Sequence, residues 1–170
     1  MILILCALKS EAQIIIEKKK LKKNDSNSKI YNNQEIILII SGIGKQNTIN
    51  SLEYIFKNNT ITKAINIGVA GCSDDFVCIG ELFCTNKSLE DINHMKLKTV
   101  DTPQIKKEDK TLLYDMEGEY FFDISKKYLN EDDIYIFKVV SDHLDDKVLS
   151  KDFVKKLIFN HYNVLEKYLV

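Results

Sequence analysis

The sequence contains no arginine and no tryptophan, and it has a single proline, Pro103, among its 170 residues. All 24 basic residues are lysines, and 25 acidic residues balance them to a formal net charge of −1. Without arginine the chain has no planar guanidinium that could hold a phosphate or a carboxylate through two parallel hydrogen bonds. The balanced charge argues against binding to nucleic acid or to an anionic membrane surface. An AT-rich genome produces the same bias toward lysine, isoleucine and asparagine, so the missing arginine by itself does not indicate a function.

Long apolar segments are also absent. Purely apolar runs such as Met1–Leu5 and Ile36–Ile40 are far shorter than the roughly 20 residues of a membrane-spanning helix. The first run has no preceding basic region and no small-residue cleavage site, so it predicts a first β-strand rather than a signal peptide. We therefore expect a cytoplasmic protein that does not interact with membranes.

Cysteine spacing excludes the common metal and disulfide patterns. Cys6, Cys72, Cys78 and Cys84 contain no C-x-x-C pair, and the three histidines are not grouped with them at the spacing of a zinc site. We expect free, buried thiols, no metal and no cofactor.

The chain has the size and composition of one globular domain, which we expect over residues 1–170. Continuous apolar runs, typical of strands buried on both faces, alternate with segments of helical periodicity. The predicted strands are 1–7, 35–41, 64–68, 78–85 and 133–141, with further extended segments at 97–100 and 111–116. The predicted helices are 10–20, with Ser10 as its N-cap, then 45–58, 118–128 and 148–169. This alternation predicts a three-layer α/β domain, in which helices flank a mostly parallel central sheet.

Acidic residues follow three of the predicted strands, at the sheet edge where such folds bind ligands. Glu11 comes after the first strand, Glu117 precedes a helix, and Asp142 ends a nearly all-apolar strand. Each has a structural explanation, because Glu11 and Glu117 suit the first turn of a helix and Asp142 suits an N-cap. Three carboxylates at one sheet edge together favour general acid–base chemistry.

Two glycine turns also follow strands. Gly42-Ile43-Gly44 is not a dinucleotide-binding G-x-G-x-x-G motif, because position 47 is Asn, and it is not a Walker loop. The segment 68–71 would let a flat ligand approach the main chain closely, although a tight turn explains it equally well.

Five short motifs occur in one order along the chain: SGIGK (41–45), NIGVAG (66–71), IGE (79–81), DMEG (115–118) and VSD (140–142). Together they resemble the nucleoside phosphorylase superfamily, and most of all its methylthioadenosine/S-adenosylhomocysteine nucleosidases. The resemblance extends from Met1 to about Asp145. It implies the fold of that superfamily, hydrolysis of the N-glycosidic bond of a small purine nucleoside, and a homodimer as the candidate assembly.

The resemblance also implies a role for each matching residue. Asp142 matches the acid that protonates purine N7, and Glu11 matches the carboxylate that polarises the attacking water. Met116 and Glu117 match the pair that packs on the ribose and hydrogen-bonds its hydroxyls. The other residues implied at the substrate are the main chain of Val69, Ala70 and Gly71 along the purine, Ser141 next to Asp142, and Lys138, which stands where the nucleosidases carry an arginine near the water. An Asp at position 142 suits 6-aminopurines as well as 6-oxopurines.

Two other functions remain open. A phosphorylase of this superfamily would hold phosphate largely with arginines, so water is the expected nucleophile here, although lysine can act as a point charge. A non-catalytic nucleoside-binding protein is the second alternative, because the segment between Glu81 and Asp115 is shorter than in the family. That segment supplies the purine-stacking aromatic residue and much of the dimer contact in the family. Here we expect residues 99–104 to form a shortened edge of the pocket.

Overall fold

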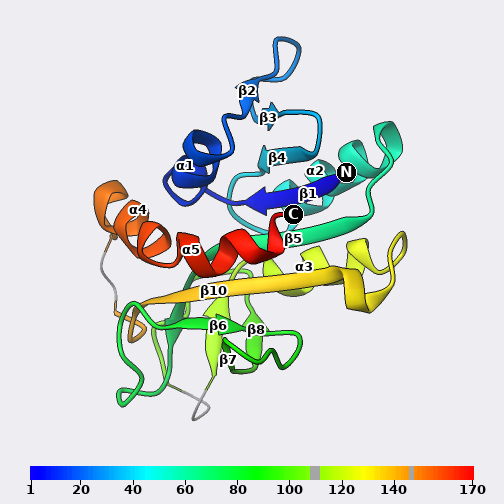
Figure 1. Cartoon of the computed structure of the whole chain (residues 1–170). Coiled ribbons are helices and arrows are strands. Elements are labelled where there is room, and N and C mark those ends of the chain that lie inside the picture. The colour runs from blue at the N-terminus through cyan, green and yellow to red at the C-terminus, as the bar shows by residue number, and fades with distance from the viewer. Residues whose placement is uncertain (108–111, 146–147) are drawn as a thin grey trace.

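Four parallel strands form the centre of a mixed sheet in the computed structural model, which describes residues 1–107, 112–145 and 148–170 (Figure 1). They are β4 (Ile36–Ile40), β1 (Ile2–Cys6), β5 (Lys63–Cys72) and β10 (Ile134–Asp142), which lie side by side in that order. Because they are parallel, their carboxyl ends meet at one edge of the sheet, and the residues that follow β1, β5 and β10 gather there.

Shorter strands extend the sheet on both sides. The pairs β3–β4, β6–β10 and β5–β9 are antiparallel, whereas β8 runs parallel to β9. Their bounds are β2 Lys22–Lys23, β3 Ile30–Asn32, β6 Leu82–Cys84, β7 Asn93–His94, β8 Leu97–Thr99 and β9 Leu113–Asp115. The β9 pairing matters for function, because it brings residues 115–117 beside the end of β5.

Helices cover both faces of the sheet (Figure 1). One face carries α1 (Lys9–Lys18), α4 (Lys151–Asn160) and α5 (Tyr162–Leu165), and the other carries α2 (Lys45–Asn58) and α3 (Gly118–Ser125). Two 3₁₀ turns, η1 (Glu131–Asp133) and η2 (Glu166–Tyr168), complete the described elements. Among the helices that the structure describes, none combines the length and the apolar character needed to cross a bilayer.

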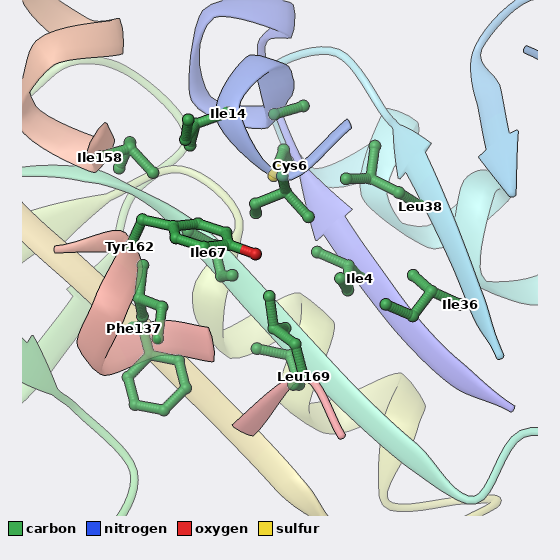
Figure 2. Packing of buried hydrophobic residues seen from close by; sticks show 14 of the residues in the cluster. Ile4, Cys6, Ile14, Ile36, Leu38, Ile67, Phe137, Ile158, Tyr162 and Leu169 are labelled. Carbon is green, nitrogen blue, oxygen red and sulfur yellow. The ribbon is translucent and has the colours of Figure 1, made fainter. Parts of the chain in front are cut away.

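The first strand shows why its sequence is apolar at every position. Alternate residues of β1 point to opposite faces, so Ile4 packs among the α1, α4 and α5 side chains while Leu3 packs against α2 and α3. Figure 2 shows the first of these clusters, in which Tyr162 of α5 and Ile158 of α4 lie near Ile67 of β5. Both clusters exclude water, so no polar residue alternates with the apolar ones.

The predicted three-layer α/β class with a mostly parallel sheet is confirmed, and local details differ. Helix α1 begins at Lys9 with Leu8 as its N-cap, so the prediction of Ser10 as the cap is wrong. The cap contact comes from Glu11 instead, whose carboxylate accepts the Leu8 N–H. The predicted strand 78–85 shortens to β6, because Gly80 has a φ of +91° and turns the chain. The predicted C-terminal helix is broken at His161.

Two further predictions concern the four cysteines and the extended segment 111–116. Cys6, Cys72 and Cys84 are buried free thiols as expected, but Cys78 is exposed. Cys78 lies in the connection between β5 and β6, and its exposure makes the prediction of a buried thiol wrong. The predicted extended segment 111–116 is observed as β9, and Thr111 lies outside the described residues.

Candidate active site

A cavity of about 340 Å³ lies at the carboxyl ends of β1, β5 and β10. Eight of the nine predicted site residues line it: Glu11, Val69, Ala70, Gly71, Met116, Glu117, Ser141 and Asp142. The three carboxylates that the sequence places after different strands therefore share one cavity. Lys138, the ninth predicted residue, is not among the lining residues.

Glu11 is held rigidly at the base of the cavity. Its Oε2 accepts the Leu8 N–H at 2.8 Å, and its Oε1 accepts the Val69 N–H at 3.1 Å. The residue is only 3% exposed, and burial raises the pKa of its carboxyl to about 7, although Lys138 and the two N–H donors oppose this rise. A carboxyl that gains and loses a proton near neutral pH is suited to general-base work.

Gly68 on β5 makes this placement of Glu11 possible. A Cβ at position 68 would lie 2.9 Å from Glu11 Oε1 and 3.3 Å from Lys138 Nζ. Any side chain larger than glycine would therefore displace one of these two charged groups. The NIGVAG motif keeps a glycine here because of this close approach.

Glu117 connects the cavity to the first glycine turn. Its Oε1 accepts the Gly44 N–H at 2.7 Å, and Gly44, with a φ of +92°, is the N-cap of α2. The carboxyl is 7% exposed, and burial raises its pKa while Lys138 opposes the rise. The Gly42-Ile43-Gly44 turn thus positions the carboxylate of Glu117.

Asp142 ends β10 with both carboxylate oxygens in contact with donors. Its Oδ1 accepts the Leu144 N–H at 2.9 Å, and Ser141 Oγ lies 2.6 Å from its Oδ2. Ser141 Oγ is also 3.2 Å from the Ala70 carbonyl oxygen, so its single proton is directed to one of these two acceptors. A Cβ on Gly71 would lie 2.7 Å from Leu144 Cδ2 and 3.1 Å from Asp142 Oδ1, so this glycine leaves room for the Asp142 turn.

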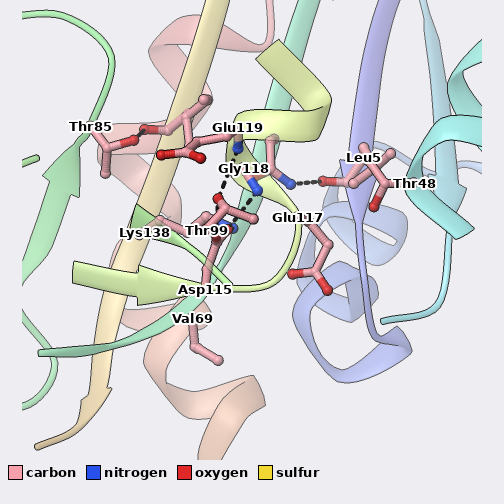
Figure 3. Close-up of polar contacts among 12 residues, drawn as sticks. Leu5, Thr48, Val69, Thr85, Thr99, Asp115, Glu117, Gly118, Glu119 and Lys138 are labelled. Atoms are coloured by element: carbon pink, nitrogen blue, oxygen red, sulfur yellow. Dashed lines mark hydrogen bonds and ion pairs between the residues drawn. The ribbon is translucent and has the colours of Figure 1, made fainter. Parts of the chain in front are cut away.

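Lys138 lies behind the cavity, in the middle of β10. Its Nζ is 2.7 Å from Asp115 Oδ2, and both side chains are almost completely buried. Asp115 also accepts hydrogen bonds from the Thr99 hydroxyl at 2.6 Å and the Gly118 N–H at 2.8 Å (Figure 3). Burial alone would lower the pKa of the ammonium, but the carboxylates of Asp115, Glu117 and Glu11 together raise it. Lys138 is therefore the buried counter-ion of three carboxylates.

Removing this counter-ion should destabilise the fold. We expect Lys138→Met to lower the free energy of unfolding by about 3–5 kcal/mol, because Asp115 would be left buried without its cation. Urea denaturation followed by circular dichroism measures the change. Lys126→Met is the matched control, since Lys126 Nζ also lies 2.7 Å from a carboxylate, that of Asp123, but at the surface. We expect the control to unfold like the unmodified protein; equal losses in the two variants would contradict the assigned role of Lys138.

The structure adds residues to the cavity that the motifs do not include. Leu8 lines it from the start of α1, and Val100, Pro103, Gln104 and Ile105 line it from the segment after β8. The expectation that residues 99–104 form an edge of the pocket is thus observed for part of that segment. Pro103, the single proline of the sequence, was the feature that could have pointed to this segment.

Metal binding has no support in the described residues, since no group of three or more His, Cys, Asp or Glu side chains there is placed to hold an ion. The lining residues that the structure describes also include no lysine, so no cation from the described part of the chain faces the ligand space.

Comparison with known proteins gives matches only at the level of structure. No protein-family model and no curated sequence matches the chain. The Streptococcus pneumoniae MTA/SAH nucleosidase in complex with 8-aminoadenine superposes with a TM-score of 0.82 at 14% identity, over 99% of this chain and 98% of that chain.

Two Helicobacter pylori enzymes are similarly close. An MTA/SAH nucleosidase complexed with a substituted pyrrolidin-3-ol has a TM-score of 0.81 at 17% identity, over 99% of this chain and 97% of that chain. Futalosine hydrolase has a TM-score of 0.81 at 16% identity, over 99% of this chain and 96% of that chain. At identities this low, the structural matches establish only the fold. The observed fold is the one that the motifs predict. The chain therefore has the fold of the methylthioadenosine/S-adenosylhomocysteine nucleosidases.

Proposed function

We propose that the protein is a purine nucleoside N-ribohydrolase that acts on substrates of the methylthioadenosine/S-adenosylhomocysteine type. The observation that carries this proposal is the convergence of three carboxylates, Glu11, Glu117 and Asp142, on one cavity at the carboxyl edge of the sheet. Solved proteins of the same fold, with TM-scores of 0.81 and 0.82, are nucleosidases and a futalosine hydrolase, which supports hydrolysis of a nucleoside.

Asp142 acts as the general acid in this proposal. Cleavage of the C1′–N9 bond leaves an oxocarbenium-like sugar and a purine anion, so a proton delivered to N7 makes the purine a better leaving group. The Leu144 N–H and the Ser141 hydroxyl hold the carboxyl in one orientation, so little reorganisation is needed when the proton moves.

Glu117 and Met116 hold the ribose. The carboxylate of Glu117, anchored by the Gly44 N–H, would hydrogen-bond the ribose hydroxyls and stabilise the positive charge that develops on the sugar ring. Met116 offers an apolar surface against the ring, and the main chain of residues 69–71 lies along the purine.

Glu11 orients the attacking water. Each of its oxygens accepts one main-chain N–H, which leaves a lone pair on each oxygen for a water in the cavity. As water adds to C1′, its proton passes to Glu11, and the products are the free base and a ribose derivative.

Water is favoured over phosphate as the nucleophile. Phosphorolysis requires cations that hold a dianion, and the described lining residues include none. Lys138, the cation that the motifs suggested for the site, is engaged with Asp115 and does not line the cavity. The apolar side chains at the mouth, Leu8 and Ile43, favour an apolar 5′ substituent such as a methylthio group.

Release of free base tests the proposal directly. Purified protein is incubated with methylthioadenosine, S-adenosylhomocysteine, adenosine and inosine, each with and without phosphate. We expect free base and a reducing sugar from at least one nucleoside, at a rate that phosphate does not change. Phosphate-dependent formation of ribose 1-phosphate would instead identify a phosphorylase. No base from any substrate would reject an enzyme and leave the nucleoside-binding alternative.

A further inference from the structure

A second cavity, of about 330 Å³, adjoins the first where α1 and α4 begin; these two helices pack against each other (Figure 1). We call it the lysine cavity, and its lining residues are Leu8, Lys9, Ser10, Gln13, Lys151 and Lys155. Leu8 lines both cavities, and Leu149 of the first cavity stands two residues before Lys151 of the second. A ligand that extends out of the first cavity past these leucines therefore meets lysines.

Two of the lysines stand where the helices disfavour a cation. Lys9 is the first residue of α1 and Lys151 is the first residue of α4, and the N-terminus of a helix already carries partial positive charge. In the described part of the chain neither ammonium group has an ion-pair partner. Glu11 in the first turn of α1 lines the first cavity, and Asp152 of α4 lies 3.5 Å from Lys155 without lining either cavity. An anion in the lysine cavity would offset this accumulated positive charge.

Ser10 adds a buried hydroxyl at the same place. It is only 7% exposed and lines the lysine cavity, yet no described residue forms a hydrogen bond with its side chain. A buried hydroxyl without a partner costs free energy, which a ligand beside it would recover. As the first two residues of α1, Lys9 and Ser10 also have main-chain N–H groups without an intrahelical acceptor. The ammonium, hydroxyl and N–H groups can all donate, so together they suit an anion with more than one oxygen.

We propose that the lysine cavity is an anion site that binds a carboxylate at the far end of the substrate's 5′ substituent. This inference rests on the proposed function, since it takes the 5′ position of the nucleoside to lie at Leu8. The substituent passes Leu8 and Leu149 as an apolar thioether chain, and its carboxylate ends between Lys9 and Lys151. S-adenosylhomocysteine carries a tail of this kind and methylthioadenosine does not, so the site favours the longer, anionic substrate.

Two synthetic thioethers of 5′-deoxyadenosine isolate the effect of the charge. One carries a 3-carboxypropyl group on the sulfur and the other carries the corresponding primary amide, so they match in length and neither has an ammonium group. Calorimetry measures their binding to the unmodified protein and to the double variant Lys9→Gln/Lys151→Gln. We expect the unmodified protein to bind the acid about 5-fold more tightly than the amide, and the double variant less than about 2-fold more tightly.

Lys57→Gln is the matched control, because Lys57 is an exposed lysine of α2 on the other face of the sheet. It should keep the full preference for the acid. All three proteins should bind the amide equally, which shows that the double variant is folded.

Binding separates this inference from the proposed function, because it requires no release of base. A preference for the acid that is lost in the double variant and kept in Lys57→Gln supports the anion site even if no nucleoside is ever hydrolysed. Equal binding of acid and amide by the unmodified protein, an unchanged preference in the double variant, the same loss in Lys57→Gln, or no binding of either thioether would each overturn it.

Discussion

Asp142→Asn lowers kcat for release of purine base by about 10²–10⁴-fold, the usual contribution of a positioned general acid. The substitution preserves shape and leaves an oxygen to accept the Leu144 N–H, while the Ser141 hydroxyl can turn to accept from the new amide. Folding should therefore be unaffected, and the loss should appear in the chemical step. Initial rates of base release under saturating substrate measure it.

A substrate whose leaving group needs no proton makes this test specific. We expect Asp142→Asn to hydrolyse 4-nitrophenyl riboside at nearly the unmodified rate, because nitrophenolate departs as an anion. Asp152→Asn on α4, where the side chain is 94% exposed, is the isosteric control and should match the unmodified protein on both substrates. A near-normal rate of purine release by Asp142→Asn, or an equal loss on both substrates, would remove Asp142 from the acid role.

Glu11→Gln should lower kcat by a similar factor, about 10²–10⁴-fold, because an amide cannot take the proton of the attacking water. The unmodified protein should also show a characteristic pH dependence. Burial raises the pKa of Glu11 to about 7, so the carboxyl is protonated and inactive as a base below that pH and ionised above it. The rising limb of the rate should therefore lie near pH 7, and this limb should be missing in Glu11→Gln.

The control for this variant lies on the same helix. Glu17 is exposed on α1, so Glu17→Gln should keep both the rate and the pH profile. Glu11→Gln also turns an amide donor toward the Leu8 N–H or the Val69 N–H, so its thermal unfolding is measured alongside activity. A Glu11→Gln protein that is folded and retains the rise through pH 7 would show that another group is the base.

Much of the fold follows from local patterns. The unbroken apolar runs at 2–6 and 36–40 predict strands buried on both faces, and the observed clusters on the two sides of β1 explain why no polar residue interrupts them. Boundaries are less predictable. Ser10 has the side chain of an N-cap, yet the distant packing that draws Glu11 inward makes Glu11 the partner of the Leu8 N–H.

The candidate site also has features that the sequence predicts and features that it does not. The sequence alone predicts that carboxylates follow three strands of a parallel sheet, because strand patterns are visible in neighbouring residues. It also shows that no arginine is present to hold phosphate, because composition is a simple count. Tertiary structure decided the partners. Glu11 accepts an N–H 58 residues away, Lys138 pairs with Asp115 instead of lining the cavity, and Gln104 lines the cavity from a segment whose Lys107 pairs with Asp75. The order of the strands sets these distances, and burial raises the pKa of Glu11. Both depend on contacts between residues that are far apart in the sequence, so a local sequence pattern does not predict them.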